Sequence, residues 1–311
     1  MWLSVIVTAL SLAAFLGGLH VMRQGLEGMG HGRLPVLLKR FSKTPTRGIL
    51  TGAVVTALMQ SSAAVTAISV GLVSSGSLYF RDALGIVLGA NVGSTITPQM
   101  LTFDLWALVI PCLAAGFLGY ASQKPRLRNP SMALIGFGTL IVALEALTTA
   151  LQPLATTEWF HHCLEYAGQN PLLAVCVGCL LSAAIQSSTA TTVITMALAT
   201  QSLIPLSGAI AIVLGANVGT CFTSVIAALG QSRPAQQVAL AHVLLNVGGV
   251  TIFLPIIAPF SDWMTHLADT PAQQIANAHT LFNVICTVLV WPVATTFARL
   301  VERLLPDQAR T

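Results

Sequence analysis

The sequence predicts an all-α integral membrane protein in which two re-entrant hairpins and two interrupted helices form an inverted repeat. Its composition is 55% hydrophobic and 8% charged, with a mean hydropathy of +0.80. These values exclude a single soluble domain with a charged surface. Apolar runs long enough to cross a bilayer recur along the whole chain, and two segments repeat the same polar motifs 126 positions apart.

Seven apolar runs are predicted to cross the membrane as helices. About 18 or more apolar residues are needed to span roughly 30 Å of hydrocarbon. The predicted crossings are residues 2–22, 82–103, 105–121, 131–151, 208–229, 236–258 and 274–297.

Positive charge sets the predicted orientation. Seven crossings place all 14 Lys and Arg residues on one side, which the positive-inside rule identifies as the cytoplasm. This predicts a multi-pass protein of the cell inner (plasma) membrane, with its N-terminus outside and its C-terminus in the cytoplasm. Residues 23–47 form a cytoplasmic basic loop, with an amphipathic helix on the membrane surface as the alternative. Contact with anionic lipid explains the net charge of +4, so no nucleic-acid partner is expected.

Two further apolar segments, residues 48–76 and 171–202, are predicted to be re-entrant hairpins. Each has about 12 to 16 apolar residues, then Gln-Ser-Ser, then about 13 more. At 1.5 Å per residue each arm spans about 18–24 Å, which suits a helix that goes halfway in and returns. Such a tip is tolerated only where protein buries it or where it lines a watery cavity.

The two hairpins are copies of each other. The stretch "GAVVTALMQSSAAVT" from Gly52 aligns with "GCLLSAAIQSSTATT" from Gly178, and "IVLGANVGSTIT" from Ile86 aligns with "IVLGANVGTCFT" from Ile212. The aligned regions share 19 identities in 46 ungapped positions. Matching polar residues at a fixed offset predict an internal duplication.

Three predicted crossings separate equivalent points of the two copies. An odd number turns the second copy upside down, so the repeat core at 171–258 is predicted to be an inverted copy of that at 48–122. Inverted repeats with interrupted helices are typical of secondary transporters. Gly-Ala-Asn-Val-Gly places two glycines and an asparagine in mid-helix, which favours unwinding and predicts the two interrupted helices.

The polar residues at the tips and breaks are neutral. Gln, Ser, Thr and Asn offer oxygens and N–H donors that suit a small hard cation beside an oxyanion. Half-helices starting after each Gln-Ser-Ser would point their positive ends at an anion. The alternative is that hydroxyls join helices by hydrogen bonds while glycines permit close packing. No dedicated arginine clamp is evident, so we expect neutral coordination.

Two histidines lie on the later predicted helices. His242 and His279 each precede an asparagine by four residues, which puts each pair on one helix face. We expect an interhelical hydrogen bond from each, with a proton-sensitive role as the alternative.

These motifs resemble those of the type II sodium-dependent phosphate cotransporters, bacterial and animal. The resemblance rests on the duplicated Gln-Ser-Ser hairpin, on the break motifs at 89–97 and 215–223, and on "FLGGLHVMRQGLEGMG", "AHVLLN" and "AHTLFN". It implies an inverted-repeat transporter, with residues 1–311 as a single transmembrane transport domain. Many bacterial members carry a C-terminal cytoplasmic regulatory domain, which is not expected in these residues.

The resemblance also implies site residues. Phosphate would contact the hairpin tips through Gln60, Ser61, Ser62, Ser187 and Ser188. Sodium would be bound by Gln186, Ser187, Thr189, Thr220 and Thr223. The broken helices would be supported by Asn91, Gly93, Asn217 and Gly219. Cys221 stands where a threonine is common in the family, which puts a ligand role for this position in doubt.

The expected function is secondary active transport that couples sodium to inorganic phosphate uptake by alternating access. Another oxyanion, sulfate or a dicarboxylate, is the alternative, and an intramembrane enzyme or an ion channel is a remote one. We expect no enzyme activity, no transition metal and no cofactor, with sodium as the coupling ion. The expected partners are phosphate, sodium and the lipid bilayer; a homodimer stays open.

Overall fold

The fold is built from helices throughout the described part of the chain. The computed structural model describes residues 2–306 apart from 31, 156, 159–165 and 167–168. The helices are α1 (Trp2–Gly30), α2 (Leu34–Phe41), α3 (Pro45–Met59), α4 (Ser62–Ser74), α5 (Phe80–Gly93), α6 (Ile96–Met100), α7 (Trp106–Ala121), α8 (Pro125–Ala155), α10 (Pro171–Ile185), α11 (Ser188–Thr200), α12 (Leu206–Ala228), α13 (Arg233–Phe253), α14 (Ile257–Thr265), α15 (Pro271–Val290) and α16 (Ala294–Leu304), with short 3-10 turns at Leu254–Ile256 and Trp291–Val293.

Five helical segments are long and apolar enough to cross a membrane. They are Ser4–Gly30, Pro125–Pro153, Leu206–Ala228, Arg233–Thr265 and Pro271–Leu304. Two of the seven predicted crossings differ from this pattern. Residues 82–103 are divided between α5 and α6, and α7, with 16 residues, is about 24 Å long and shorter than the hydrocarbon core.

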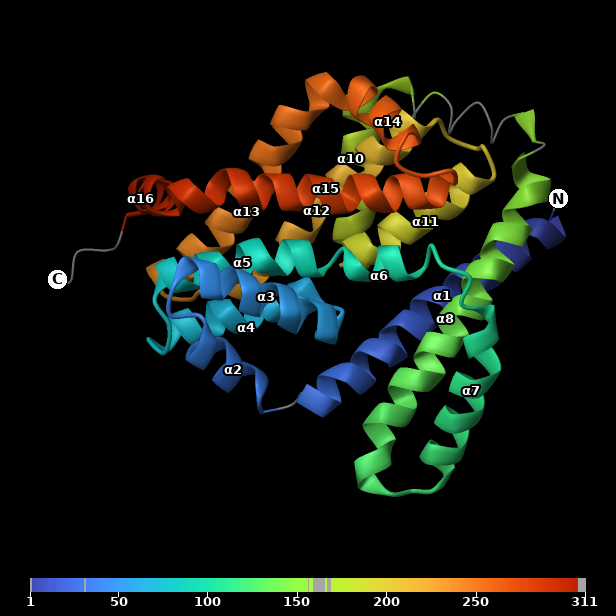
Figure 1. Cartoon of the computed structure of the whole chain (residues 1–311), viewed down its shortest axis with the longest axis horizontal. Helices are drawn as coiled ribbons and strands as arrows, with labels where there is room; N and C mark the ends of the chain where they lie inside the picture. Colours follow the sequence, from blue (N-terminus) through green and yellow to red (C-terminus); the bar gives the residue numbers. More distant parts are fainter. Residues whose placement is uncertain (1, 31, 156, 159–165, 167–168, 307–311) are drawn as a thin grey trace.

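Three helices of the N-terminal half, α1, α7 and α8, pack as a separate group. In Figure 1, α1 crosses α8, and α7 lies along α8 away from the other helices. Glycines make the α1–α8 contact close, because a Cβ on Gly18 would lie 3.0 Å from the Leu140 amide nitrogen and one on Gly25 would overlap the Ala133 backbone. Small residues at such crossings let two backbones approach within van der Waals contact.

Residues 23–47 do not form the predicted basic loop. α1 continues to Gly30, and α2 and the start of α3 occupy most of the remainder. The sequence has no proline before Pro35 and no capping residue directly after Met22, so nothing stops the helix there. α2 is amphipathic, with Leu38 buried and Lys39 and Arg40 exposed, which agrees with the helical alternative.

Both predicted hairpins are present as two helices joined by a tight turn. α3 and α10 each begin with a proline in the first turn and an N-cap side chain, Thr44 or Asn170, that accepts a backbone hydrogen bond. Each ends at a glutamine in the left-handed region, Gln60 at φ 56° and Gln186 at φ 57°. The helical hairpins are confirmed; their re-entrant position in a membrane stays a prediction.

The two predicted helix breaks have different outcomes. In the first copy the helix ends at Gly93 and resumes at Ile96, as predicted. In the second copy α12 runs unbroken through the same motif, so that prediction is wrong. The decisive difference is Pro98, which lacks an N–H and clashes with the carbonyl four residues earlier, at Ser94. Its counterpart is Ser224, which a helix accommodates.

The glycines of the repeated motif serve close packing. A Cβ on Gly89 would overlap the Ile49 carbonyl oxygen of α3, and one on Gly215 would overlap the Val175 carbonyl oxygen of α10. In each copy the hairpin's first arm, α3 or α10, therefore lies directly against the helix that carries the motif, α5 or α12, which we call the motif helix. A helical glycine costs only about 1 kcal/mol, and the contact offsets this cost.

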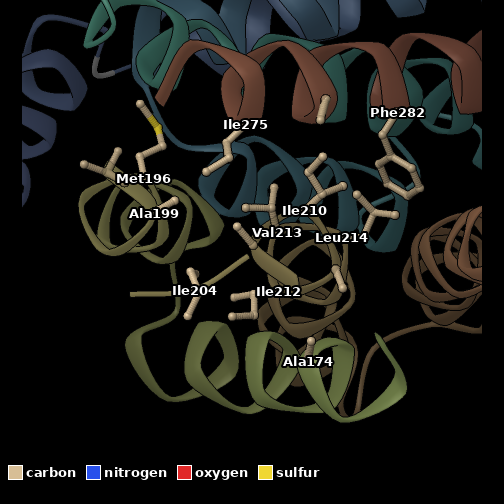
Figure 2. Packing of buried hydrophobic residues seen from close by; sticks show 14 of the residues in the cluster. Ala174, Met196, Ala199, Ile204, Ile210, Ile212, Val213, Leu214, Ile275 and Phe282 are labelled. Atoms are coloured by element: carbon tan, nitrogen blue, oxygen red, sulfur yellow. The ribbon is translucent and has the colours of Figure 1, made fainter. Parts of the chain in front are cut away.

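Each copy also packs on the other. α4 of the first copy contacts α12 and α13, and α11 of the second contacts α6. A buried apolar cluster surrounds α12, where Ile210, Val213 and Leu214 meet side chains of the neighbouring helices, among them Ile275 and Phe282 of α15 (Figure 2). At the hairpin tips, Ser187 and Ser188 are buried, whereas Gln60, Ser61 and Ser62 are partly buried.

Candidate functional site

The tip of the second hairpin joins α10 to α11 at Gln186 and Ser187. Ser187 is the N-cap of α11, and its Oγ accepts a hydrogen bond of 3.1 Å from the Ala190 amide. The same Oγ accepts a second bond of 3.1 Å from Nη2 of Arg23 on α1. Ser188 and Thr189 are buried directly after the cap, whereas Gln186 is exposed.

The sequence did not predict an arginine at this tip. We expected Arg23 in a cytoplasmic loop and expected neutral coordination, but Arg23 lies on α1 and its guanidinium donates to Ser187 at the second tip. The helix pattern of α1 continues through "MRQGLEGMG", which could have indicated that Arg23 lies one turn beyond Leu19 on a buried face. Its target on a hairpin 164 residues later could not be predicted.

The tip of the first hairpin is built in the same way. Ser61 caps α4 and its Oγ accepts from the Ala64 amide at 3.2 Å. Gln60, Ser61 and Ser62 are partly buried. Gln60 lines a cavity of about 330 Å³ together with Met22 and Leu26 of α1. Both tips therefore lie beside the same turn of α1.

The threonines proposed for sodium lie on α11 and α12. The Thr220 hydroxyl donates to the Asn217 carbonyl at 2.8 Å, which leaves its oxygen lone pairs available. The Thr223 hydroxyl oxygen is buried and has no hydrogen-bond partner. Among the described residues no hydrogen bond joins either threonine to Gln186 or Ser187, so the structure does not gather this set through direct contacts.

A polar cluster holds Asn91 of the first motif helix. His242 Nε2 lies 3.2 Å from Asn91 Oδ1, and Asn91 Nδ2 donates to Asn246 Oδ1 at 3.2 Å. His242 Nδ1 lies 3.0 Å from Ser224 Oγ on α12. Because Asn91 Oδ1 can only accept, Nε2 carries the proton. The Ser224 hydroxyl also lies 2.7 Å from the Cys221 carbonyl oxygen, so its one proton is shared between that oxygen and His242 Nδ1. Cys221 accepts from Asn246 Nδ2 at 3.3 Å, so it takes a place in this network.

An equivalent cluster holds Asn217 of the second motif helix. His279 Nε2 lies 3.2 Å from Asn217 Oδ1, and Asn283 Nδ2 lies 3.4 Å from the same oxygen. The interhelical bonds expected of both histidines are thus confirmed. The clusters differ in two respects. Asn91 donates to Asn246 in the first, whereas Asn283 donates to Asn217 in the second. His279 Nδ1 and Asn283 Oδ1 are also buried without a partner, whereas their counterparts in the first cluster are bonded.

The comparison with family models gives the chain its family. The model described as Na+/Pi-cotransporter matches twice, over residues 14–149 and 143–268. The chain belongs to the Na+/Pi-cotransporter family. One family model matching two successive segments agrees with the internal duplication. No solved structure matches the chain.

Several relatives place the chain within the Na+/Pi-cotransporter family. It is 32% identical over 254 residues to the uncharacterized protein YqeW of Bacillus subtilis, covering 82% of this chain and 83% of the relative. It is 28% identical over 259 residues to the "Putative inorganic phosphate export protein YjbB" of Escherichia coli, covering 83% of this chain but 48% of the relative. It is 37% identical over 93 residues to the human "Sodium-dependent phosphate transport protein 2B", covering 28% and 14%.

In this Na+/Pi-cotransporter family member the site offers more donors than acceptors at the second tip. A guanidinium, a serine hydroxyl and the free amides at the start of α11 converge there, and such a set suits an anion. Acceptor oxygens without partners lie further along α12 and α15. No group of three or more His, Cys, Asp or Glu side chains with metal-ligand placement occurs in the described part of the chain.

Proposed function

We propose that the protein is a secondary transporter that couples sodium to the uptake of inorganic phosphate by alternating access. The observation that carries the proposal is the pair of hairpin tips. Both have a left-handed glutamine and a serine that caps the following half-helix, and both lie beside the same turn of α1. Two helix N-termini with free amides can bind a phosphate ion between them.

The residues proposed for phosphate are those of the two tips: Gln60, Ser61, Ser62, Ser187 and Ser188. Serine hydroxyls and helix N-terminal amides donate hydrogen bonds, which phosphate oxygens accept. These donors replace the hydration that the anion loses when it is buried.

The residues proposed for sodium are Gln186, Ser187, Thr189, Thr220 and Thr223. The unpartnered, buried hydroxyl oxygen of Thr223 supports this assignment, because a buried acceptor without a partner is unfavourable and a cation would satisfy it. Asn91 and Asn217, in their histidine clusters, hold the motif helices against α13 and α15 on either side of the site.

The proposed transport direction is inward. YjbB is named for phosphate export and protein 2B for sodium-dependent phosphate transport, so the names of relatives do not choose the direction. A coupled carrier moves its substrate along the sum of the two gradients, and an inward sodium gradient would drive phosphate in. An orientation with the N-terminus outside and the C-terminus in the cytoplasm, and a second copy inverted relative to the first, belong to this proposal.

Uptake of radiolabelled phosphate into proteoliposomes tests the proposed function. An inward sodium gradient should drive accumulation, and replacing it by a potassium or a proton gradient should abolish it. Unlabelled sulfate or succinate in excess should leave uptake unchanged. Strong competition by either anion would assign the site to that substrate class, and accumulation without sodium would remove the coupling ion from the proposal.

A pair of variants separates the two ligands. Thr223→Ala should raise the sodium concentration for half-maximal uptake directly. It should weaken phosphate binding only through the coupling between the two sites, which is typically about 5- to 150-fold in affinity. Saturating sodium should largely restore the apparent phosphate affinity. Ser62→Ala should instead weaken phosphate binding even in saturating sodium. Uptake measured over a grid of both ligands shows the difference, and an unchanged sodium dependence in a normally expressed Thr223→Ala protein would contradict the sodium assignment.

A further inference from the structure

The guanidinium of Arg23 lies at the tip of the second hairpin without an anionic partner. Its Nη2 donates to Ser187 Oγ, and its Nε is buried and has no hydrogen-bond partner. Among the described residues the one ion pair joins Arg81 to Glu302. Glu27, one turn further along α1, exerts an electrostatic influence on Arg23 but forms no ion pair with it. A partly buried cation without an ion-pair partner is unfavourable.

Ser187 shows which kind of ligand this tip can receive. Its Oγ already accepts from the Ala190 amide and from Arg23. A hydroxyl oxygen has two lone pairs, so in this conformation none is left for a cation. The hydroxyl proton is still available, and it can be donated to an anion. Ser187 therefore fits the phosphate set in this conformation, and its proposed role toward sodium would require a conformation in which the Arg23 bond is released.

The start of α11 adds positive character at the same point. The amides of Ser188 and Thr189 are the first two of the helix, which no preceding helical carbonyl reaches. The helix dipole adds partial positive charge there. The guanidinium, the Ser187 hydroxyl proton and these two amides are all donors, and one anion could accept from all of them.

We propose that Arg23 is a phosphate-binding residue that supplies the fixed positive charge of the anion site. This inference rests on the proposed function and deepens it. A planar guanidinium has five N–H groups, so it can donate two parallel hydrogen bonds to phosphate while one N–H of Nη2 stays on Ser187. Because the charge comes from α1, the phosphate would bridge α1 and the second hairpin.

The test compares Arg23→Gln, Arg23→Lys and Arg128→Gln with the unmodified full-length protein. Arg128 is an exposed arginine of α8, so its replacement removes the same charge away from the site. In proteoliposomes at saturating sodium, Arg23→Gln should raise the apparent KM for phosphate about 10- to 100-fold, since a charged hydrogen bond is lost. Arg23→Lys, which keeps the charge but not the fork, should fall in between, and Arg128→Gln should match the unmodified protein.

A binding measurement separates a phosphate contact from a structural role. Phosphate should raise the Tm of the unmodified protein in detergent with saturating sodium, and Arg23→Gln should lose most of this increase. If Arg23 only anchors α1 to the hairpin, the variant's Tm falls but the phosphate-induced increase and the KM stay normal, which overturns the inference. If Arg23→Gln does not fold, Arg23→Lys decides, because an unchanged KM there contradicts the need for a guanidinium. Absence of phosphate uptake by the unmodified protein would instead overturn the proposed function.

Discussion

His242 shows how a single buried side chain connects three helices. From α13 its ring reaches Asn91 of α5 on one side and Ser224 of α12 on the other. Because α5 and α12 belong to different copies of the repeat, this imidazole ties the two copies together. In a membrane interior such bonds are typically worth about 1 kcal/mol each.

Removing the ring should therefore destabilise the protein. His242→Ala leaves Asn91 Oδ1 short of a partner and opens a small cavity, so we expect a loss of about 2–3 kcal/mol. Unfolding by a denaturing detergent against the unmodified protein measures it. His242→Gln is the matched control, because its amide can still donate to Asn91 and should recover part of the loss. Equal stability of all three proteins would show that the network contributes nothing.

At the residue scale, the sequence predicted which side chains matter better than where they point. The equal spacing of His242 and His279 to their asparagines predicted interhelical bonds, and both are present. The partners could not be predicted, since they depend on how α13 and α15 cross the motif helices. The predicted position of Arg23 was wrong for a related reason: a positive charge near the end of an apolar run resembles a loop residue until the helix is known to continue.

At the scale of elements, one proline accounts for the difference between α5 and α12, the helices that carry the repeated Gly-Ala-Asn-Val-Gly motif. The first helix is interrupted between α5 and α6, from four residues before Pro98, while α12 continues through Ser224. The glycines and asparagine are common to both copies, so they do not cause the break. Glycine lowers helix stability by about 1 kcal/mol, whereas an interior proline costs about 3 kcal/mol. The prediction of two breaks relied on the glycines, although proline destabilises a helix more than glycine does.

Replacing Pro98 should therefore close the break. Pro98→Ser restores an N–H that can reach the Ser94 carbonyl, and a closed break gives the amides of Ile96 and Thr97 helical partners on α5. These amides should exchange hydrogen at least about tenfold more slowly, since a new hydrogen bond contributes about 1–1.5 kcal/mol. Hydrogen exchange of peptides covering residues 90–101 measures this. Pro111→Ser in α7, a helix that already continues through its proline, should change exchange around 94–98 very little. Unchanged exchange in Pro98→Ser would attribute the break to tertiary packing.

The glycine contacts predict a second difference between elements. Gly215→Ala places a Cβ against the Val175 carbonyl oxygen, which is backbone and cannot move aside. We expect a loss of about 3 kcal/mol or more, seen as a lowered Tm and lost expression. Gly248→Ala is the control on α13, where a Cβ meets nothing within 4 Å, and it should be neutral or slightly stabilising. Tolerance of Gly215→Ala would mean that α10 and α12 are less closely packed.

For the whole molecule, the sequence predicted the duplication and the helical hairpins, and the crossing count only in part. Five long apolar helices agree with predicted crossings. The other two predicted crossings differ: residues 82–103 are divided between α5 and α6, and the 16 residues of α7 are fewer than a bilayer needs. Length alone cannot decide, since α7 lies along α8, and a short helix supported by a long neighbour can tilt less or thin the bilayer around it.

Labelling from each side decides whether α7 crosses. In a background without cysteines, Asp104→Cys before α7 should react with an impermeant thiol reagent from outside, and Lys124→Cys after it should react from the cytoplasm. Arg303→Cys at the end of α16 should label from the cytoplasm as well and serves as the reference. Labelling of Asp104→Cys and Lys124→Cys from the same side would make α7 a surface or re-entrant element and would change the parity on which the inverted repeat depends.

The glycine seams between each hairpin and its motif helix also bear on how the protein is made. Gly52 and Gly178 present nearly the same surface, as do Gly89 and Gly215, so α3 could dock on α12 and α10 on α5. The order of synthesis opposes such mispairing. At roughly 5–20 residues per second, the 126-residue offset gives the first hairpin about 6–25 s to join its own partner before the second emerges. A translational pause after residue 100 would lengthen this interval, and faster translation would shorten it.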